Sequence, residues 1–483
     1  MKVEQIYTGC LAQGAYYIES EGEAVIIDPL RETQPYVEKL EKEGAKLKYI
    51  FETHFHADFV SGHLDLAKKT GATIVYGPNA STEYAIHSAQ DGEELKVGKL
   101  TFVVLHTPGH TMESTTYLLR DESGKDYAIF SGDTLFLGDV GRPDLAIKQG
   151  QITREDLAGF LFDSLRNKIM PLADDVIVYP AHGAGSACGK NLSTDTWGYL
   201  GDQKKTNYAL RADMTKEEFV AEVTAGLTPP PQYFAKNAMM NKSGYDSFEE
   251  VLEKGTVALT PARFEELVET EEALMLDVRD SAAYAAEHVP NSIFIGIDGS
   301  FAPWVGALIT DLKQPIVLIA PEGREEEVVT RLSRVGYDNT LGYLAGGIAA
   351  WKAAGKETDS TQTIQAEALA AKMAGDFDGV VLDVRKPSEF LSQHVVGATN
   401  FPLDYINNNM NRLERGATYY INCRSGYRSM VAASILQARG FRHVVDITNG
   451  WPAIEKSNMP ITDYACPSSL TQEVIDQAVA AVV

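Results

Sequence analysis

The stretch that decides the fold is Thr53-His54-Phe55-His56-Ala57-Asp58-Phe59, which places three potential metal ligands within five residues. The apolar run 47–51 precedes it and predicts a short β-strand, and residues 64–69 behind it predict a helix that ends at Gly71. The ligands are therefore expected on a loop where a strand ends and a helix begins. Imidazole nitrogen and carboxylate oxygen suit zinc and iron, so the stretch predicts a metal site.

Three later segments repeat this arrangement, each with an apolar run followed by one polar residue. The residues that follow these runs are His110, Asp133 and His182. The order and spacing of the four motifs resemble the metallo-β-lactamase superfamily over residues 1 to about 235. The resemblance implies an αββα sandwich, and a predicted β-hairpin over 16–29 would feed its core.

Length and composition set the broad class of protein. A chain of 483 residues is long enough for three domains. Its 43 basic and 67 acidic side chains give a net charge of −24, which argues against nucleic acid or an anionic membrane as a partner. No apolar run is long enough to span a bilayer, and four cysteines do not make a disulfide framework. A cytoplasmic protein is expected.

The second half of the chain contains an internal repeat. Residues 274–280 recur as 380–386, and residues 344–351 recur more loosely as 447–454. Each copy alternates helices with short β-branched strands, which predicts two α/β domains with parallel sheets. The pair resembles rhodanese sulfurtransferase domains. The predicted divisions are a first domain at 1–235, a connector at 236–255, rhodanese-like domains at 256–357 and 362–465, and a tail at 466–483.

A second chemical centre is predicted at Cys423, between a strand at 419–422 and a helix from about 430 to 439. Free backbone N–H groups, the helix dipole and nearby arginines stabilise a thiolate, a cysteine persulfide or an oxyanion at such a loop. The loop residues expected to bind substrate are Arg424, Ser425, Gly426, Tyr427, Arg428 and Ser429. The spacing from Cys423 to Arg428 is one residue shorter than the Cys-x5-Arg of tyrosine phosphatases, and the rhodanese family uses this shorter loop.

The first copy has Ala320 at the position of the cysteine, in the acidic loop 320–327. Acidic side chains oppose anion binding, and alanine cannot carry sulfur. This copy is expected to be catalytically silent. A spacer, an oligomer contact and a docking surface all remain open as its role.

The metal chemistry depends on Phe59. Two-metal members of the superfamily carry His-x-His-x-Asp-His, and here the last position is Phe59. The resemblance to persulfide dioxygenases implies that His54, His110 and Asp133 hold one Fe(II) per chain, with zinc as the alternative. The residues left over either orient these ligands or hold a second metal, and they are His56, Asp58 and His182.

Two further residues near these motifs are candidates for handling substrate. In the resembled dioxygenases an arginine at the position of Arg142 holds a carboxylate of the thiol substrate, and a structural ion pair is the alternative. Cys188 follows the His182 motif in a loop of small residues and is a candidate sulfur relay, although packing alone also accounts for it. Cys10 and Cys466 have no motif around them and are interpreted as plain thiols.

Together these features resemble a persulfide dioxygenase–rhodanese fusion of sulfide oxidation. Such an enzyme oxidises a low-molecular-weight persulfide, such as glutathione persulfide, with O2 to sulfite and thiol. Rhodanese sulfurtransfer then links thiosulfate or sulfite with thiol or persulfide, and a homodimer or homotetramer is expected. The alternatives are a glyoxalase II-like thioester hydrolase with a fused sulfurtransferase, and a non-catalytic carrier or sensor of sulfane sulfur.

Overall fold

The computed structural model describes the chain except residues 148–150, 228, 376, 467–473, 475–476, 479 and 481–483. Most of the predicted tail at 466–483 therefore lies outside the described residues. The chain divides into two compact units, one of Met1–Phe248 with Ser333–Gly336 and one of Glu249–Leu332 with Tyr337–Val483. Among the described helices, none combines the length and the apolar character that a bilayer crossing requires.

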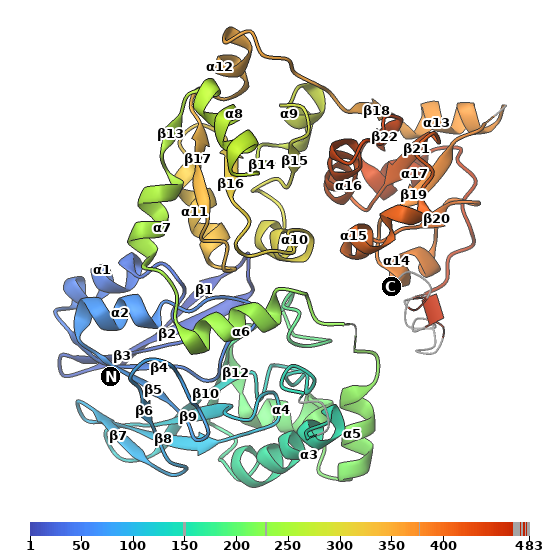
Figure 1. Cartoon of the computed structure of the whole chain (residues 1–483). Helices are drawn as coiled ribbons and strands as arrows, with labels where there is room; N and C mark the ends of the chain where they lie inside the picture. The colour runs from blue at the N-terminus through green and yellow to red at the C-terminus, as the bar shows by residue number, and fades with distance from the viewer. Residues whose placement is uncertain are drawn as a thin grey trace. The chain divides into compact units, whose positions relative to one another are not determined.

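The first unit contains two six-stranded sheets (Figure 1). The first sheet consists, in order, of β1 (Lys2–Thr8), β2 (Gln13–Ser20), β3 (Glu23–Ile27), β4 (Lys46–Phe51), β5 (Thr73–Tyr76) and β6 (His87–Ser88). The second consists, in order, of β12 (Gly198–Tyr199), β11 (Ile177–Pro180), β10 (Asp126–Gly132), β9 (Thr115–Arg120), β8 (Leu100–His106) and β7 (Glu94–Val97). The predicted hairpin is confirmed, because β2 pairs antiparallel with β3.

Alternating side chains place these sheets in a four-layer sandwich. Tyr16 and Ile27 lie in the core between the sheets, where they meet Phe102 and Phe130 of the second sheet. On the opposite face of the first sheet, apolar side chains pack against α1 (Gln34–Glu43) and α2 (His63–Thr70). The outer face of the second sheet packs against α3 (Arg154–Ser164), α4 (Leu200–Thr206) and α5 (Lys216–Thr224). The predicted αββα sandwich is confirmed.

Shorter helices complete this unit, and the connector continues the chain from it into the second unit. The π-helix η1 (Leu165–Ile169) continues α3, and the 3-10 helix η2 (Tyr208–Leu210) follows α4. The predicted connector holds two helices, α6 (Phe234–Ser243) and α7 (Phe248–Gly255), where the sequence indicated only one near residue 248. The buried face of α6 consists of Phe234, Asn237 and Asn241, so its polar side chains hid the apolar pattern of a helix.

The second unit contains two five-stranded sheets with the same topology. The first has the order β13 (Ala258–Leu259), β17 (Thr340–Leu344), β16 (Ile316–Ile319), β14 (Leu274–Asp277) and β15 (Ile293–Phe294). The second has the order β18 (Gln362–Ile364), β22 (Val444–Ile447), β21 (Tyr419–Asn422), β19 (Val380–Asp383) and β20 (Thr399–Asn400). Every pairing in them is parallel. The predicted pair of parallel α/β domains is confirmed.

Helices cover both of these sheets. The first copy carries α8 (Pro261–Thr270), α9 (Ser281–Ala286), α10 (Phe301–Leu308), α11 (Glu325–Ser333) and α12 (Gly347–Ala353). The second carries α13 (Ala366–Met373), α14 (Pro387–Ser392), α15 (Ile406–Asn409), α16 (Tyr427–Ala438) and α17 (Gly450–Lys456), with 3-10 helices η3 (Leu403–Tyr405) and η4 (Met410–Arg412). The copies pack together within this unit, where the backbone N–H of Phe294 donates to the hydroxyl of Ser434 at 2.9 Å.

Candidate functional site

The loop between β4 and α2 is anchored by Asp28, at the end of β3. Its carboxylate accepts hydrogen bonds from the backbone N–H and the hydroxyl of Thr53, each at 2.8 Å. Asp28 has a φ of 50°, a left-handed conformation that aspartate adopts more readily than most residues. This arrangement fixes the start of the loop at the residue before His54.

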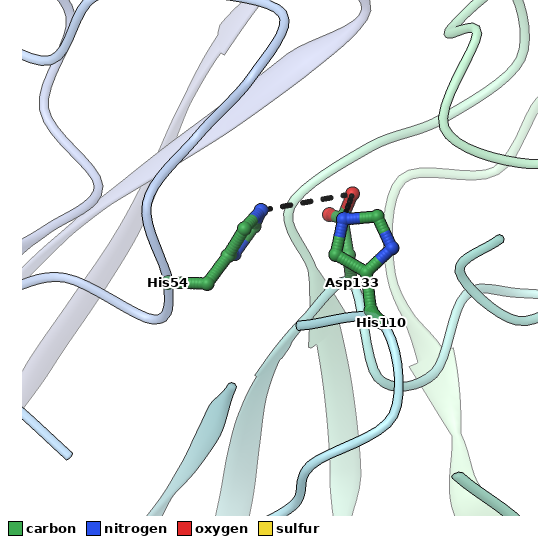
Figure 2. Close-up of side chains that lie close together, drawn as sticks. All are labelled: His54, His110 and Asp133. Atoms are coloured by element: carbon green, nitrogen blue, oxygen red, sulfur yellow. Dashed lines mark ion pairs between the residues drawn. The ribbon is translucent and has the colours of Figure 1, made fainter. Parts of the chain in front are cut away.

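His54, His110 and Asp133 converge in the first unit, although they come from three separate loops (Figure 2). Their ligand atoms all lie within 4.8 Å of one another, and all three side chains are buried. Oδ2 of Asp133 lies 3.9 Å from Nε2 of His54 and 3.4 Å from Nε2 of His110. The structure thus brings together the three residues that the sequence grouped as metal ligands.

Both imidazoles are oriented by a hydrogen bond at the far side of the ring. Nδ1 of His110 lies 2.8 Å from the carbonyl oxygen of Arg142. A carbonyl only accepts, so the ring hydrogen is on Nδ1 and Nε2 presents its lone pair to Asp133. Nδ1 of His54 lies 3.0 Å from the hydroxyl of Thr53. Because this hydroxyl donates its hydrogen to Asp28, it accepts a hydrogen bond from Nδ1 of His54. The two rings therefore present the same tautomer, in the form that binds a metal.

The charge state of His54 also suits a metal ligand. Burial, followed by the neighbouring His56, His110 and His182, holds the pKa of His54 well below its ordinary value. A neutral imidazole at neutral pH leaves the nitrogen lone pair available.

Unsatisfied polar atoms mark the same place. Within the described residues, both carboxylate oxygens of Asp133, Nε2 of His182 and Oδ1 of Asp58 are buried without a hydrogen-bond partner. Buried polar atoms are costly to leave unpaired, and a bound cation would satisfy these together. The donor set of imidazoles and carboxylates therefore fits a zinc or iron ion.

A second group of ligand atoms adjoins the first. The ligand atoms of His56, Asp58 and His182 also lie within 4.8 Å of one another. Nε2 of His182 lies 3.3 Å from Asp58 and 3.6 Å from Oδ1 of Asp133, so Asp133 faces both groups. The Nδ1 of His182 lies 3.3 Å from the carbonyl oxygen of Ala12, which directs Nε2 toward these carboxylates.

Phe59 and His56 distinguish the second group from the first. The buried Phe59 ring lies 4.3 Å from the His56 ring, measured between centroids. Burial is the largest single influence on the pKa of His56 and lowers it, but Asp28, Glu52 and Asp58 together raise that pKa to about 9. Nε2 of His56 lies 3.0 Å from Asp28. His56 is thus held as a cation beside carboxylates, which competes with metal binding.

Arg142 and Cys188 adjoin the metal-ligand groups. The guanidinium of Arg142 forms a two-point ion pair with Asp144 at 2.6 and 2.8 Å and also donates to the carbonyl of Ala187 at 3.3 Å. The Cys188 sulfur lies within 4.8 Å of ligand atoms of Asp133 and His182. Burial, with the charges of Asp58 and Asp133, raises the pKa of Cys188 well above its ordinary value, so the metal-free site holds it as a thiol.

One positioning residue escaped the sequence analysis. The amide of Asn241, on α6, donates to the carbonyls of His56 and Phe59 at 2.8 Å each. Its oxygen accepts from the N–H of Ser61 at 2.9 Å. Asn241 therefore holds the ligand loop from a helix some 180 residues away in sequence, which no local pattern reveals.

The Cys423 sulfur is buried at the end of β21. The N–H of Gly426 lies 3.1 Å from this sulfur and donates to it, and the thiol donates to the Ser429 hydroxyl at 3.5 Å. Gly426 has a φ of 91°, which favours glycine, and caps α16. That helix begins at Tyr427, three residues before the predicted start, so residues 427–429 form its first turn. One backbone N–H therefore faces the sulfur, and the substrate-binding role of the loop stays a prediction.

The other loop residues divide into paired and exposed groups. Arg428 is paired with Glu389 at 2.7 and 2.9 Å, and the hydroxyl of Tyr427 donates to the carbonyl of Gly296 in the first copy at 2.8 Å. Arg424 and Ser425 are exposed beside them.

The Asp-x-Arg sequence found in both copies is structural. Nε and Nη2 of Arg279 donate hydrogen bonds to the Asp277 carboxylate at 2.6 to 3.1 Å. Nη2 also donates to the carbonyl of Glu287 at 2.8 Å. Arg385 makes the same set of bonds to Asp383 and to the carbonyl of Gln393. Because the copy without a cysteine keeps this pair, the pair supports the fold.

Comparison with known proteins identifies three domains. Residues 8–182 match the metallo-beta-lactamase superfamily, and residues 260–354 and 365–457 each match the rhodanese-like domain. A solved structure of a metallo-beta-lactamase from Staphylococcus aureus subsp. aureus COL is 31% identical, with a TM-score of 0.61. The match covers 71% of this chain and 99% of that one.

Curated relatives of the first domain fall into two enzyme classes. The hydroxyacylglutathione hydrolase GloC of Haemophilus influenzae is 29% identical over 39% of this chain and 94% of its own length. The human mitochondrial persulfide dioxygenase ETHE1 is 33% identical over 33% of this chain and 59% of its own length. The two classes are about equally similar to the chain.

Proposed function

This chain belongs to the metallo-β-lactamase superfamily and carries two rhodanese-like domains behind that fold, and we propose that it is a persulfide dioxygenase with a fused sulfurtransferase. The observation that carries the proposal is Phe59, which stands where two-metal hydrolases of the superfamily have a histidine. The His54, His110 and Asp133 group beside it is complete for one metal. A rhodanese-type cysteine on the same chain supplies the second half of a sulfur reaction.

In this proposal His54, His110 and Asp133 hold iron, which supplies the means for a persulfide to react with O2. Two imidazoles and one carboxylate are a donor set that would suit an iron ion in this role. The carbonyl of Arg142 and the hydroxyl of Thr53 keep the imidazole lone pairs aimed at one point. All three ligand side chains are buried, so the site they form is screened from bulk solvent. With one molecule of water, the persulfide and O2 would give thiol, sulfite and two protons.

The Cys423 domain then handles sulfane sulfur. The Cys423 thiolate attacks the outer sulfur of a persulfide or thiosulfate, and the thiolate or sulfite leaves with the electron pair of the broken S–S bond. The Gly426 N–H would stabilise the sulfur anion, and the positive end of the α16 dipole lies beside it, since that helix begins at Tyr427. The substrate-binding roles of Arg142 and of residues 424–429, and a sulfur relay at Cys188, remain predictions. Arg142 would first have to release Asp144.

A second candidate function is thioester hydrolysis. The second ligand group of His56, Asp58 and His182 favours it, as do hydrolase relatives at 29 to 34% identity. It requires two metals, with zinc as the expected ion. The ion pair of His56 with Asp28 and the apolar Phe59 both disfavour the second metal.

Metal content and oxygen uptake separate the two candidates. Protein prepared without air is analysed for iron and zinc, and O2 consumption is followed after glutathione persulfide is added. We expect about one iron per chain, with O2 uptake and sulfite formation. Two zinc ions per chain, with hydrolysis of a glutathione thioester and no O2 uptake, would instead establish the hydrolase.

A further inference from the structure

The rhodanese copy without a cysteine contacts the loop that carries Cys423. Both copies belong to the second compact unit. The hydroxyl of Tyr427 donates to the carbonyl of Gly296, in the first copy, at 2.8 Å. The Tyr427 ring lies 5.9 Å from the Phe294 ring, measured between centroids, with the planes 62° apart. The first copy therefore holds both the polar and the apolar part of this side chain.

Gly299 of the first copy provides the space for the Tyr427 ring. A Cβ atom at position 299 would lie 2.3 Å from Cε2 and 2.4 Å from Cζ of that ring, much closer than carbon atoms pack. The φ of Gly299 is outside the left-handed region, so its backbone conformation does not itself require glycine. The close approach of the ring is thus a reason for glycine at this position.

Tyr427 lies next to the groups that contact the Cys423 sulfur. It is the first residue of α16 and follows Gly426, whose N–H donates to the sulfur at 3.1 Å. The Ser429 hydroxyl, which accepts from the thiol at 3.5 Å, belongs to the same helical turn. A displacement of Tyr427 would therefore change the position of the Gly426 N–H relative to the sulfur.

The rest of the loop is anchored within the second copy. The N–H of Trp451 donates to the carbonyls of Cys423 at 2.8 Å and of Arg424 at 3.2 Å. Arg428 is paired with Glu389. These bonds fix the start of the loop and the outer side of α16, whereas the contacts of Tyr427 come from the first copy. Both copies therefore contribute to the conformation of the loop.

We propose that the copy without a cysteine is part of the sulfurtransfer site, because Gly296 and Gly299 hold Tyr427 and thereby align the Gly426 N–H with the Cys423 sulfur. Tyr427 is a positioning residue that acts through Gly426. The proposal rests on the sulfurtransferase role of Cys423 and gives the first copy a role in it. An N–H that donates to sulfur stabilises the thiolate, which is the form that attacks sulfane sulfur.

The test follows sulfurtransfer from thiosulfate to cyanide by the full-length chain at a series of pH values. In Gly299→Ala the added methyl group displaces the Tyr427 ring, and the sulfur loses its N–H donor. The acidic limb of kcat/KM for thiosulfate should move up by about one pH unit, with a rate roughly tenfold lower below the limb and close to that of the parent above it. A fold damaged in general would instead lower the rate at every pH.

The matched control is Gly416→Ala, in the second copy. Gly416 has an ordinary φ and open space where a Cβ would lie, so this variant should keep the parent profile. The charged residues on the elements around the sulfur are Arg424, Arg428 with its partner Glu389, Asp404, the Asp383–Arg385 pair, and Asp446 of β22, which lies opposite Ile421. They are the same in every variant, so a shift of the limb reports the lost donor. An unchanged limb in Gly299→Ala, or a uniform loss of rate, would overturn the proposal.

Two variants of Tyr427 show whether Gly299 acts through this residue. Leucine leaves the space beside Gly299 free, so Gly299→Ala should add no further shift in a Tyr427→Leu background. Shifts that add would show that Gly299 acts by another route. Tyr427→Phe removes only the hydroxyl that bonds to Gly296, and it should move the limb in the same direction. It serves as the second test if Gly299→Ala does not fold, and an unchanged limb would then overturn the proposal.

Hydrogen exchange separates this proposal from the sulfurtransferase assignment. Exchange is measured by mass spectrometry on the peptide that covers residues 423–430, without substrate. The amide of Gly426 should exchange at least about tenfold faster in Gly299→Ala than in the parent, because its hydrogen bond to the sulfur is lost. If exchange behaves in this way and the parent transfers no sulfur from thiosulfate, the assignment of Cys423 fails and the positioning role stands. Equal exchange in the two proteins would overturn the positioning role, whatever their activity.

Discussion

Replacing Thr53 by valine tests how the protein orients its metal ligands. Valine keeps the shape of threonine and removes one hydroxyl, which donates to Asp28 at 2.8 Å and lies 3.0 Å from Nδ1 of His54. His54 then loses the group that orients its ring. Loss of such a partner behind a metal ligand lowers metal affinity by about 10- to 100-fold. Asp28 also loses a hydrogen bond to a buried charge, worth roughly 1.5–3 kcal/mol of stability.

The assay separates the two effects of Thr53→Val. Iron affinity is measured anaerobically by competition with a chelator, and stability is measured by denaturant unfolding of the metal-free protein. Thr53→Ser is the matched control, because it keeps the hydroxyl and loses only a methyl group, worth about 1 kcal/mol. Thr53→Val should bind iron at least about tenfold more weakly than Thr53→Ser. Equal iron affinity in the two variants would refute the claim that the Thr53 hydroxyl orients His54.

Three other substitutions follow from the same contacts. Asp133→Ala removes the carboxylate that faces both imidazoles. Its affinity for iron should fall by more than the roughly 100-fold expected when a residue that only orients a ligand is lost, and O2 uptake should be lost with it, while sulfurtransfer from thiosulfate persists. Iron retained at parental levels would contradict the ligand assignment. Phe59→His places an imidazole beside His56, whose ring centroid lies 4.3 Å from that of Phe59, and metal analysis should then show a second ion per chain; a count that stays at one would show that more than Phe59 prevents the second site. Asp446→Asn should alter how the stability of the folded protein depends on pH. The pKa of Asp446 in the folded protein, about 6, exceeds its ordinary value of 3.8, so the unfolded chain loses this proton first. Asp446 therefore destabilises the folded protein progressively as the pH rises from about 4 to 6. The variant should be more stable than the parent by up to roughly 3 kcal/mol at pH 7 and equal to it below pH 4, and an equal difference at both pH values would contradict the linkage.

Local patterns were enough to predict elements with strong apolar runs and clear stops. The strand at 419–422 has the bounds that the sequence indicated, and the strand predicted at 47–51 and the helix predicted at 64–69 are each within one residue of the observed bounds at either end. Each is a short run with a clear stop, and the helix ends at Gly71 with a φ of 73°. The start of α16 was predicted too late, because Gly426 was interpreted as part of the loop and is in fact the cap of the helix.

The sequence alone predicted the candidate metal ligands but not the residues that position them. Histidines and an aspartate after successive strands are visible in the sequence, and the structure brings them together from strands of both sheets. The contacts of Asn241 to the ligand loop and the pairing of Arg142 with Asp144 depend on tertiary packing, and no periodic pattern encodes them. Asp446 did leave a local signal, a charged residue in the strand 444–447, which a search for polar residues in buried strands would find.

The most direct test of the account is the sulfur product of the intact chain compared with that of Cys423→Ser. Both proteins receive glutathione persulfide and O2, and sulfite and thiosulfate are quantified alongside O2 uptake. Serine keeps most of the shape of cysteine but carries no sulfur, and the first copy has Ala320 at this position, so no other rhodanese cysteine replaces it. We predict equal O2 uptake, with thiosulfate from the intact chain and sulfite alone from the variant. The same ratio of sulfite to thiosulfate from both proteins would contradict the claim that the two centres share one sulfur pool.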